Sequence, residues 1–224
     1  MIVRIPTQYN QHRADSGRLS SGLDPSDADK KKQKVQQLQN VPRKIRDMFV
    51  PEPGFTFVGA DYDAIEWCTM VWYGTKLPGS LGFHLDLLKR FRNKEIDPHK
   101  FLAKFIYSCE ESQVTKRQRE VAKPYTYGYW ENPISVGRRV GHLDTVAKQI
   151  GIAHEQAFRM KEIRAWMLET VKKQKYAQTP LGYRRWFWEW KPKPEEVFAH
   201  FGSGAAADLI KWMLLRLTEK YPYE

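Results

Sequence analysis

Helical periodicity through the middle of the chain is the sequence feature that most constrains the fold. Apolar residues recur every three or four positions there, which is the period of a helix that buries one face. No internal repeat is visible. The spacing and its start and stop signals predict helices over 63–73, 81–91, 98–107, 115–130, 142–150, 154–175 and 204–217.

Two short segments that flank the helical middle have strand character instead. Residues 55–60 (FTFVGA) are aromatic and β-branched, and they run from a Pro-Gly turn directly into Asp61. Residues 186–190 (WFWEW) alternate at period two, as a hairpin strand does. The sequence therefore predicts an α+β chain, and we read the polar segment 22–37 as a surface loop.

The chain is basic: lysine and arginine outnumber aspartate and glutamate by 37 to 26, a net charge of +11. Such a chain either meets a polyanion, nucleic acid first of all, or is merely soluble and basic, and charge alone leaves both alternatives open. Cys68 and Cys109 are too isolated for a zinc finger or a disulfide scaffold. No apolar run has the length of a signal peptide or a membrane span, so we expect a soluble cytoplasmic protein.

Asp61 ends the expected strand, where rigid backbone can hold a carboxylate in a cleft, and Asp63 and Glu66 follow closely. Phosphoryl transfer needs such a carboxylate to hold divalent metal, which neutralises charge on the attacking oxygen and the triphosphate. An aspartate after a strand is more often a helix cap, and that alternative stays open, above all for Asp63.

Arg119, Lys123 and Tyr127 recur every four positions and therefore share one face of the expected helix 115–130. Two cations one turn apart can bind successive phosphates of a triphosphate, and an aromatic ring one turn further can lie against a sugar or base. The alternative is a solvated basic face with a tyrosine anchored in the core. Pro124 complicates both interpretations, because proline inside a helix costs about 3 kcal/mol.

An ordered series of segments along nearly the whole chain resembles the family A DNA polymerases, the DNA polymerase I type. Asp61 lies in a segment similar to motif A (VALDYSQIE), and Arg119, Lys123 and Tyr127 fit the spacing of motif B. The other matching segments are 16–21 (SGRLSS, like TGRLSS), 38–42 (LQNVP, like LQNIP), 43–49 with Arg46 and Phe49 (like RxIRxxF), Asp97-x-His99 (like DxH), 179–185 (TPLGYRR, like TxxGRRR) and 204–211 (GAAADLIK, like GTAADLxK).

The resemblance implies a fold in which a predominantly helical fingers subdomain is inserted in a partial antiparallel-sheet palm. Residues 1–75 would be the N-terminal part of the palm with motif A, and 76–178 the fingers with motif B. Residues 179–224 would be the returning palm hairpin and helix, which end before motif C.

The resemblance also implies roles for residues near motif A. Asp61 would bind the catalytic Mg²⁺ ions of a two-metal mechanism, assisted by the carbonyl of Tyr62. Glu66 would be the steric gate, a carboxylate that leaves no room for a ribose 2′-OH and so selects deoxynucleotides.

Residues of motif B would bind the incoming dNTP. Arg119 and Lys123 would hold the triphosphate, and Lys123 would also protonate the pyrophosphate leaving group. Tyr127 would stack beside the sugar.

Other segments would contact the primer-template DNA. Arg18 would reach the minor groove at the primer end, where every correct pair presents acceptors. The remaining DNA contacts that we expect are Gln39, Asn40 and Arg184.

Four positions depart from the family pattern. Cys68 stands where motif A usually has arginine, Ser203 where a DNA-contacting glutamine precedes GTAAD, and Glu131-Asn132 where Tyr-Gly ends the fingers helix beside the template base. The 22–37 segment is also longer than the family's turn. The changes at 203 and 131–132 fall mainly on template contacts.

The family's thumb would precede Met1, and motif C, which contributes the second metal-binding aspartate, would follow Glu224. The resemblance therefore predicts one subunit of a split polymerase that adds dNTPs to a primer 3′ end when partner chains supply thumb and motif C. Alone it should be inactive or nearly so, because one carboxylate holds two metal ions poorly. By analogy with split replication genes, we expect a bacteriophage source and hence a bacterial host cytoplasm.

Two other functions stay open. The chain could be a catalytically inactive polymerase remnant that serves as a nucleic-acid-binding or scaffolding subunit, as the changed template positions indicate. It could also be an RNA polymerase of the related single-subunit type, but Glu66 argues against that.

Overall fold

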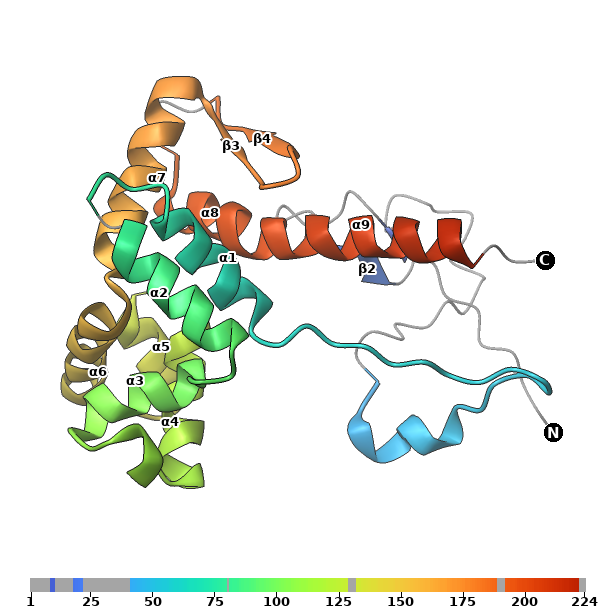
Figure 1. The fold of residues 1–224 in the computed structure, drawn as a ribbon, viewed down its shortest axis with the longest axis horizontal. Coiled ribbons are helices and arrows are strands. Elements are labelled where there is room, and N and C mark those ends of the chain that lie inside the picture. The colour runs from blue at the N-terminus through green and yellow to red at the C-terminus, as the bar shows by residue number, and fades with distance from the viewer. Residues whose placement is uncertain are drawn as a thin grey trace. The chain divides into compact units, whose positions relative to one another are not determined.

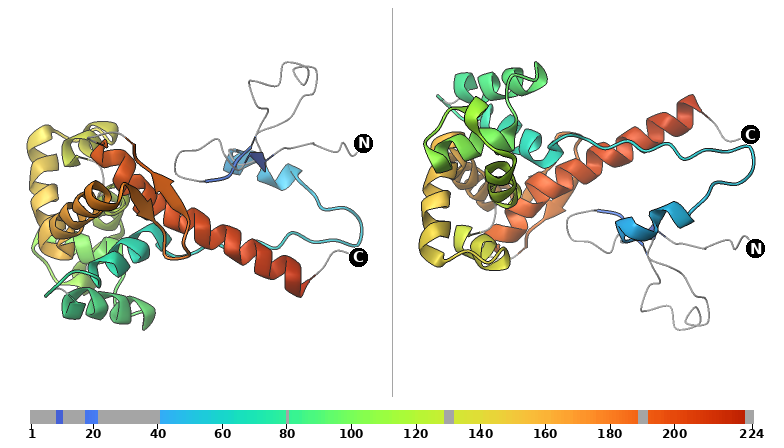
Figure 2. Two further views of the ribbon diagram at one scale, coloured as in Figure 1. Left: turned by 90° about the horizontal axis from the view of Figure 1, so that it is seen from above. Right: turned by 90° about the horizontal axis from the view of Figure 1, so that it is seen from below.

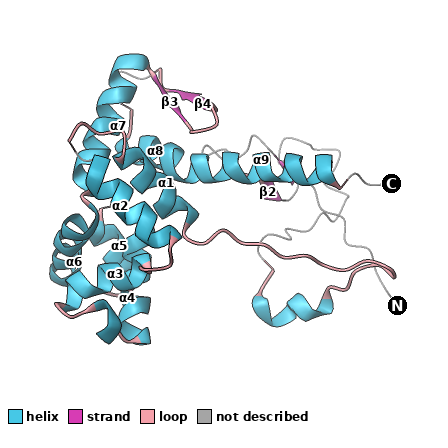
Figure 3. Cartoon of the chain, in the orientation of Figure 1, coloured by secondary structure: helices cyan, strands magenta, loops and turns pink. Residues whose placement is uncertain are grey.

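The computed structural model describes residues 9–10, 18–21, 41–79, 81–128, 132–188 and 192–221. Helices dominate these residues, and the strands are short (Figure 3). The chain divides into two compact units, Met1–Asp63 and Ala64–Glu224, which we describe separately. No helix in the described ranges combines the length and hydropathy that crossing a bilayer requires.

The described residues of the first unit contain little regular structure. Strands β1 (Tyr9–Asn10) and β2 (Ser20–Ser21) pair antiparallel, and a 3₁₀ helix, η3 (Arg43–Met48), buries none of its residues. The predicted loop 22–37 lies outside the described residues.

The prediction of a strand over 55–60 is wrong for this structure. The segment has no regular secondary structure, and its apolar side chains are exposed, Val58 by 89%. A strand is stable only when its backbone N–H and C=O groups pair with a neighbour. None of the described strands pairs with residues 55–60.

The second unit is a helical body with a hairpin and a long terminal helix (Figure 1). Its helices before the hairpin are α1 (Ile65–Gly74), α2 (Leu81–Arg92), α3 (Pro98–Tyr107), the 3₁₀ turn η4 (Glu111–Gln113), α4 (Lys116–Tyr127), α5 (Pro133–Arg139), α6 (Asp144–Phe158) and α7 (Met160–Gln174). The hairpin strands β3 (Tyr176–Gln178) and β4 (Arg184–Trp186) then lead to α8 (Pro194–Ala199), the π-helix η5 (His200–Gly204) and α9 (Ala205–Lys220).

Helix α1 forms the centre of the core. The fully buried ring of Trp67 contacts Phe91 of α2, with 5.4 Å between ring centroids, and Phe158 of α6, at 5.6 Å. At the other end of α1, Tyr73 meets Phe201 of η5 edge to face at 4.9 Å. One helix therefore joins the helical body to the segment that leads into α9.

The predicted end of a helix at residue 150 is wrong, because α6 continues through Gly151 to Phe158. The chain turns instead at Arg159, whose φ of 51° lies in the left-handed region. Gly151 allows α6 to pack closely against Pro133, because a Cβ at this position would lie 2.7 Å from Cγ of Pro133. Helices α5 and α8 were not expected.

Helix α9 is buried only at its start, where Ala205, Ala206 and Ala207 lie in the core. Its remainder extends from the helical body of the second unit (Figure 2). Exposed apolar side chains occur along this part, including Trp212, Leu214, Leu215 and Leu217. These side chains are therefore not covered by the helical body of the second unit.

Candidate nucleotide-binding site

Helix α4 places Arg119, Lys123 and Tyr127 at four-residue intervals, as the sequence predicts. The helix begins with a capping box: Thr115 Oγ1 accepts from the N–H of Gln118 at 3.3 Å, and Gln118 Oε1 accepts from the N–H of Thr115 at 2.8 Å. It continues through Pro124 to Tyr127. The proline therefore does not interrupt the face that carries the three side chains.

Arg119 is held by Asp97, the residue before α3. Its Nε and Nη2 atoms both lie 2.9 Å from Asp97 Oδ2, and Nη1 lies 3.3 Å from Glu120 Oε1. The other oxygen of Asp97 accepts from the N–H groups of His99 at 2.8 Å and Lys100 at 3.0 Å. One carboxylate therefore caps α3 and also fixes the guanidinium on α4.

The charge state of Asp97 fits this double role. Partial burial acts to raise its pKa, but the hydrogen bond from the Lys100 N–H and the Arg119 guanidinium together lower it below the usual range. The sequence signal for this residue was its place before Pro98, which is typical of an N-cap. Its contact with Arg119 was not predicted.

Tyr127 packs against His99 of α3, with 5.0 Å between ring centroids and an interplanar angle of 62°. His99 is buried, so the half-buried tyrosine ring has a rigid neighbour. Lys123 is half-buried and, within the described ranges, makes no ion pair or hydrogen bond. The α4 face thus holds one anchored cation, one cation that is available to a ligand, and one braced aromatic ring.

Glu66 lies in the first turn of α1, and its Oε1 accepts a hydrogen bond of 2.9 Å from the hydroxyl of Ser203 in η5. Ser203 is buried, and it occupies the position where the family's pattern has glutamine. The sequence separates these residues by 137 positions. Their contact therefore has no local sequence signal.

Asp61 and Tyr62 belong to the first unit and lie in exposed backbone without regular structure. Their grouping with the α4 residues would involve both units and stays a prediction. A carboxylate and a main-chain carbonyl are the hard oxygen ligands that Mg²⁺ prefers. Among the described residues, no group of three or more His, Cys, Asp or Glu side chains could hold a metal ion.

The predicted DNA contacts are described in part. Arg18 is exposed just before β2, whereas Gln39 and Asn40 lie outside the described residues. Arg184 is exposed on β4, where its Nε donates to Gln178 Oε1 at 3.0 Å. Asn132, one of the changed template positions, caps α5 by accepting from the N–H of Ile134 at 3.0 Å.

A hydrogen bond that the sequence did not predict joins two of the family-like segments. Thr179 Oγ1 donates to Asp208 in the first turn of α9 and accepts from the N–H of Tyr183 at 3.0 Å. Tyr73 of α1 donates its hydroxyl to the carbonyl of Gln178 at 3.1 Å. Burial, and then the Asp208 carboxylate, raise the pKa of Tyr73 well above its usual range. These contacts fix the hairpin against α1 and α9.

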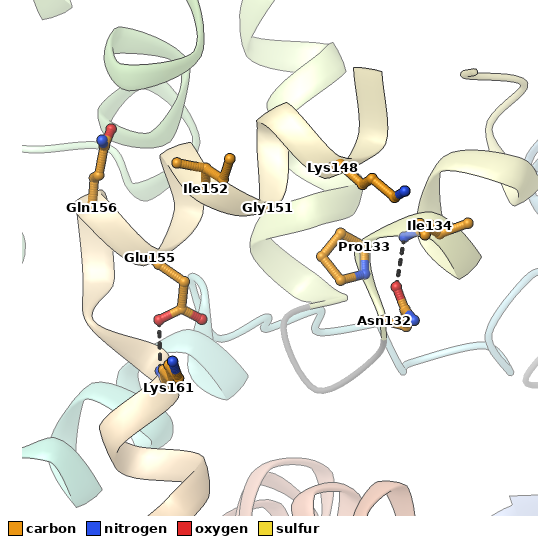
Figure 4. A pocket seen from close by; sticks show the side chains of 9 residues that line it. All are labelled: Asn132, Pro133, Ile134, Lys148, Gly151, Ile152, Glu155, Gln156 and Lys161. Carbon is orange, nitrogen blue, oxygen red and sulfur yellow. Dashed lines mark hydrogen bonds between the residues drawn. The ribbon is translucent and has the colours of Figure 1, made fainter. Parts of the chain in front are cut away.

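A depression of about 660 Å³ lies away from these residues, between α5, α6 and the start of α7 (Figure 4). Pro133 and Ile152 contribute apolar walls, and Glu155 accepts from the N–H of Lys161 at 2.6 Å. None of the predicted site residues lines it. We therefore do not include it in the nucleotide site.

The fold is similar to that of a solved structure, the POL domain of Pol1 from M. smegmatis in a complex with DNA primer-template and dNTP. The TM-score is 0.70 at 24% sequence identity, over 96% of this chain and 37% of that one. At this identity the similarity shows the fold alone.

Curated relatives are bacterial DNA polymerases I. That of Chloroflexus aurantiacus is 29% identical over 233 residues, which cover 96% of this chain and 22% of the relative. That of Pseudomonas aeruginosa is 31% identical over 160 residues, which cover 69% of this chain and 14% of the relative. The thermostable enzyme of Thermus aquaticus is 26% identical over 239 residues, which cover 96% of this chain and 25% of the relative. The chain thus spans a quarter or less of the length of these relatives.

The family model for DNA polymerase family A matches residues 2–224, which is nearly the whole chain. The match takes in both units and every segment that resembled the family in the sequence. The chain therefore belongs to DNA polymerase family A.

Proposed function

We propose that this chain carries the nucleotide-selecting part of a template-directed DNA polymerase, as one subunit of a split enzyme. It binds the incoming dNTP, and partner chains supply the thumb and motif C. The observation that carries the proposal is the α4 face, where Asp97 fixes Arg119 one turn before Lys123 and His99 braces Tyr127. Family membership supports DNA and dNTPs as the substrates.

The α4 residues act on the triphosphate and the sugar. Lys123 binds a phosphate through its ammonium group and can donate an Nζ proton to the departing pyrophosphate. Arg119 keeps its Asp97 contact and offers the remaining guanidinium N–H groups to a second phosphate. Tyr127 stacks beside the sugar, and its contact with His99 limits the rotation of the tyrosine ring.

Glu66 selects the sugar. Its carboxylate closes the space that a ribose 2′-OH would need, and the Ser203 hydroxyl holds that carboxylate in one orientation. The Asp61 carboxylate and the Tyr62 carbonyl would hold Mg²⁺, which supplies charge neutralisation at the attacking oxygen and the triphosphate. A second carboxylate is needed for a pair of metal ions, and we assign it to a partner chain.

Two exposed apolar segments support the need for further protein. Residues 55–60 have strand character but pair with no described strand, and α9 exposes Trp212, Leu214 and Leu215. An added hairpin beside residues 55–60 would pair their backbone and set Asp61 at the end of a real strand. Partner chains would bury the apolar face of α9.

Primer extension by a reconstituted assembly tests this function. The purified chain is mixed with candidate partner chains, primer-template DNA, dNTPs and Mg²⁺. We expect extension only in the full mixture, and we expect Asp61→Ala to abolish it while the neighbouring Asp63→Ala does not. Extension that is unchanged in Asp61→Ala would contradict the proposal.

One observation favours the inactive nucleic-acid-binding subunit as the second candidate. Asn132 at the template position is occupied as a helix cap. This candidate predicts salt-dependent DNA binding without extension in any mixture.

A further inference from the structure

The β3–β4 hairpin carries a continuous row of flat side chains, which we call the stack. The guanidinium carbon of Arg184 lies 4.7 Å from the centroid of the Tyr176 ring, and that ring lies 5.0 Å from Trp186 at an interplanar angle of 56°. Trp186 in turn stacks on Trp188 with 5.2 Å between centroids and only 6° between planes. The stack therefore runs from a cation at one end to an indole at the other.

Strand geometry explains why these groups share a face. Tyr176 pairs with Trp186 and Gln178 with Arg184, so these side chains lie on one side of the hairpin. The alternate residue Phe187 is buried on the other side, and its N–H donates to the carbonyl of Lys175 at 2.8 Å. Anchoring of Phe187 holds the two flanking tryptophans outward.

The tryptophan end of the stack is exposed to solvent. Trp186 is 46% exposed and Trp188 is 80% exposed. Two stacked indoles left in water lose the free energy that burial of such large rings would contribute. Paired exposed tryptophans with a fixed orientation indicate a surface that receives another flat group.

The charge around the stack is positive. Residues 171–188 contain Lys172, Lys173, Lys175, Arg184 and Arg185 and no aspartate or glutamate, while Glu169 pairs with Lys173 at 3.4 Å and Glu189 follows Trp188 in the sequence. Arg185 pairs with Glu196 at 2.9 Å, whereas Arg184 has no carboxylate partner among the described residues. A cation without a counter-charge beside exposed rings suits a ligand that combines flat groups with negative charge.

We propose that this stack, Tyr176, Arg184, Trp186 and Trp188, binds single-stranded nucleic acid by base stacking. An unpaired base lies on the ring of Trp188, and the adjoining phosphates lie near Arg184 and the lysines that end α7. Stacking on an aromatic ring tolerates every base, because each base has a flat face. Duplex DNA fits poorly, since its bases are already stacked on one another.

The inference does not rest on polymerisation, because stacking requires neither metal nor dNTP. None of the α4 residues, nor Glu66 or Asp61, belongs to the stack. Arg184 is also an expected DNA contact of the polymerase, but Trp188, whose substitution decides the test, is not. Its failure and the failure of the proposed function are therefore distinguishable.

Fluorescence anisotropy with labelled oligo(dT), without Mg²⁺ or dNTP, tests the proposal. We expect Trp188→Ala to weaken binding about tenfold, because one base loses its stacking partner. Trp188→Phe should retain most of the affinity. Arg184→Gln should make the dissociation constant less dependent on salt, because one phosphate contact is lost.

The matched control is Trp212→Ala, which removes a tryptophan of α9 that is 47% exposed and lies under Arg216. Its affinity for oligo(dT) should equal that of the unmodified chain. Equal affinities of Trp188→Ala and the unmodified chain would overturn the proposal. So would a Trp188→Ala variant that loses as much affinity for duplex DNA as for oligo(dT), or a proline-rich peptide that binds the stack while oligo(dT) does not.

Discussion

The α3–α4 region and helix α9 differ in where their side chains find support. On α4, Arg119 and Tyr127 each have a partner on or just before α3, at Asp97 and His99. On α9, the apolar residues beyond Ala207 are largely exposed, Leu215 by 65%. The α4 face is therefore supported from within the second unit, whereas most apolar side chains of α9 have no such support among the described residues of that unit.

The largest expected effect compares the packed helical body, to which α3 and α4 belong, with helix α9. Trp67→Ala should lower the free energy of unfolding by about 3 to 5 kcal/mol, because a fully buried indole leaves a cavity between α1, α2 and α6. Leu215→Ala on the exposed part of α9 should change it by less than about 0.5 kcal/mol. Chemical denaturation of the isolated chain measures both, and equal losses would break the contrast between the two regions.

The next effect concerns catalysis on the α4 face. Lys123→Gln should lower kcat of the reconstituted assembly about 100-fold, because the leaving group loses its proton donor and a phosphate loses its cation. Lys116→Gln at the exposed start of the same helix is the control. Single-nucleotide incorporation measures both variants. A comparable loss in the control would mean that general positive charge, and not the position of Lys123, is what matters.

Sequence periodicity located most of the second unit because its helices bury one face each, and local signals mark their ends. The sequence contains a local signal for α5 as well: Asn132 followed by Pro133 is an N-cap before a proline at the first helical position. The error at Gly151 arose because a glycine that permits close packing looks like a helix end in sequence. The close approach of that glycine to Pro133 is a tertiary contact, which the local sequence does not record.

The candidate site likewise has features that local sequence predicts and features that depend on distant contacts. Spacing alone predicted the shared face of Arg119, Lys123 and Tyr127, because four residues make about one turn. The supports at Asp97 and Ser203 depend on contacts between distant segments, which no local pattern records. The prediction of a strand over 55–60 is wrong for a related reason, since a segment with strand-forming residues needs a neighbouring strand to pair with.

A smaller effect should follow from removal of the carboxylate before α3. Asp97→Ala should lower the free energy of unfolding by about 1 to 2 kcal/mol, because α3 loses its N-cap and Arg119 loses its partner. It should also raise KM for dNTP, since the guanidinium is no longer held in place. Denaturation and steady-state kinetics measure the two effects, with Asp86→Ala as a surface control on α2.

The difference in the free energy of unfolding between the unmodified chain and Asp97→Ala depends on pH with a definite sign. Asp97 has a lowered pKa in the folded chain, so its stabilising effect is complete above the unfolded pKa of about 3.9. It fades as the pH falls through the folded pKa. The stability difference between the unmodified chain and Asp97→Ala should therefore shrink below about pH 4. A difference that grows on acidification would contradict the assigned role.

The smallest effect tests whether η5 supports Glu66 of α1, the proposed sugar gate, as α3 supports the α4 face. Ser203→Ala removes the hydrogen bond to Glu66 and leaves the carboxylate itself in place. We expect dNTP incorporation to persist while discrimination against ribonucleotides falls about fivefold, because loss of one hydrogen bond to a charged group costs roughly 1 kcal/mol or more. Ser203→Thr, which retains the hydroxyl, should keep the discrimination. If Ser203→Ala lowers dNTP and ribonucleotide incorporation equally, the serine supports the fold of η5 and not the orientation of Glu66.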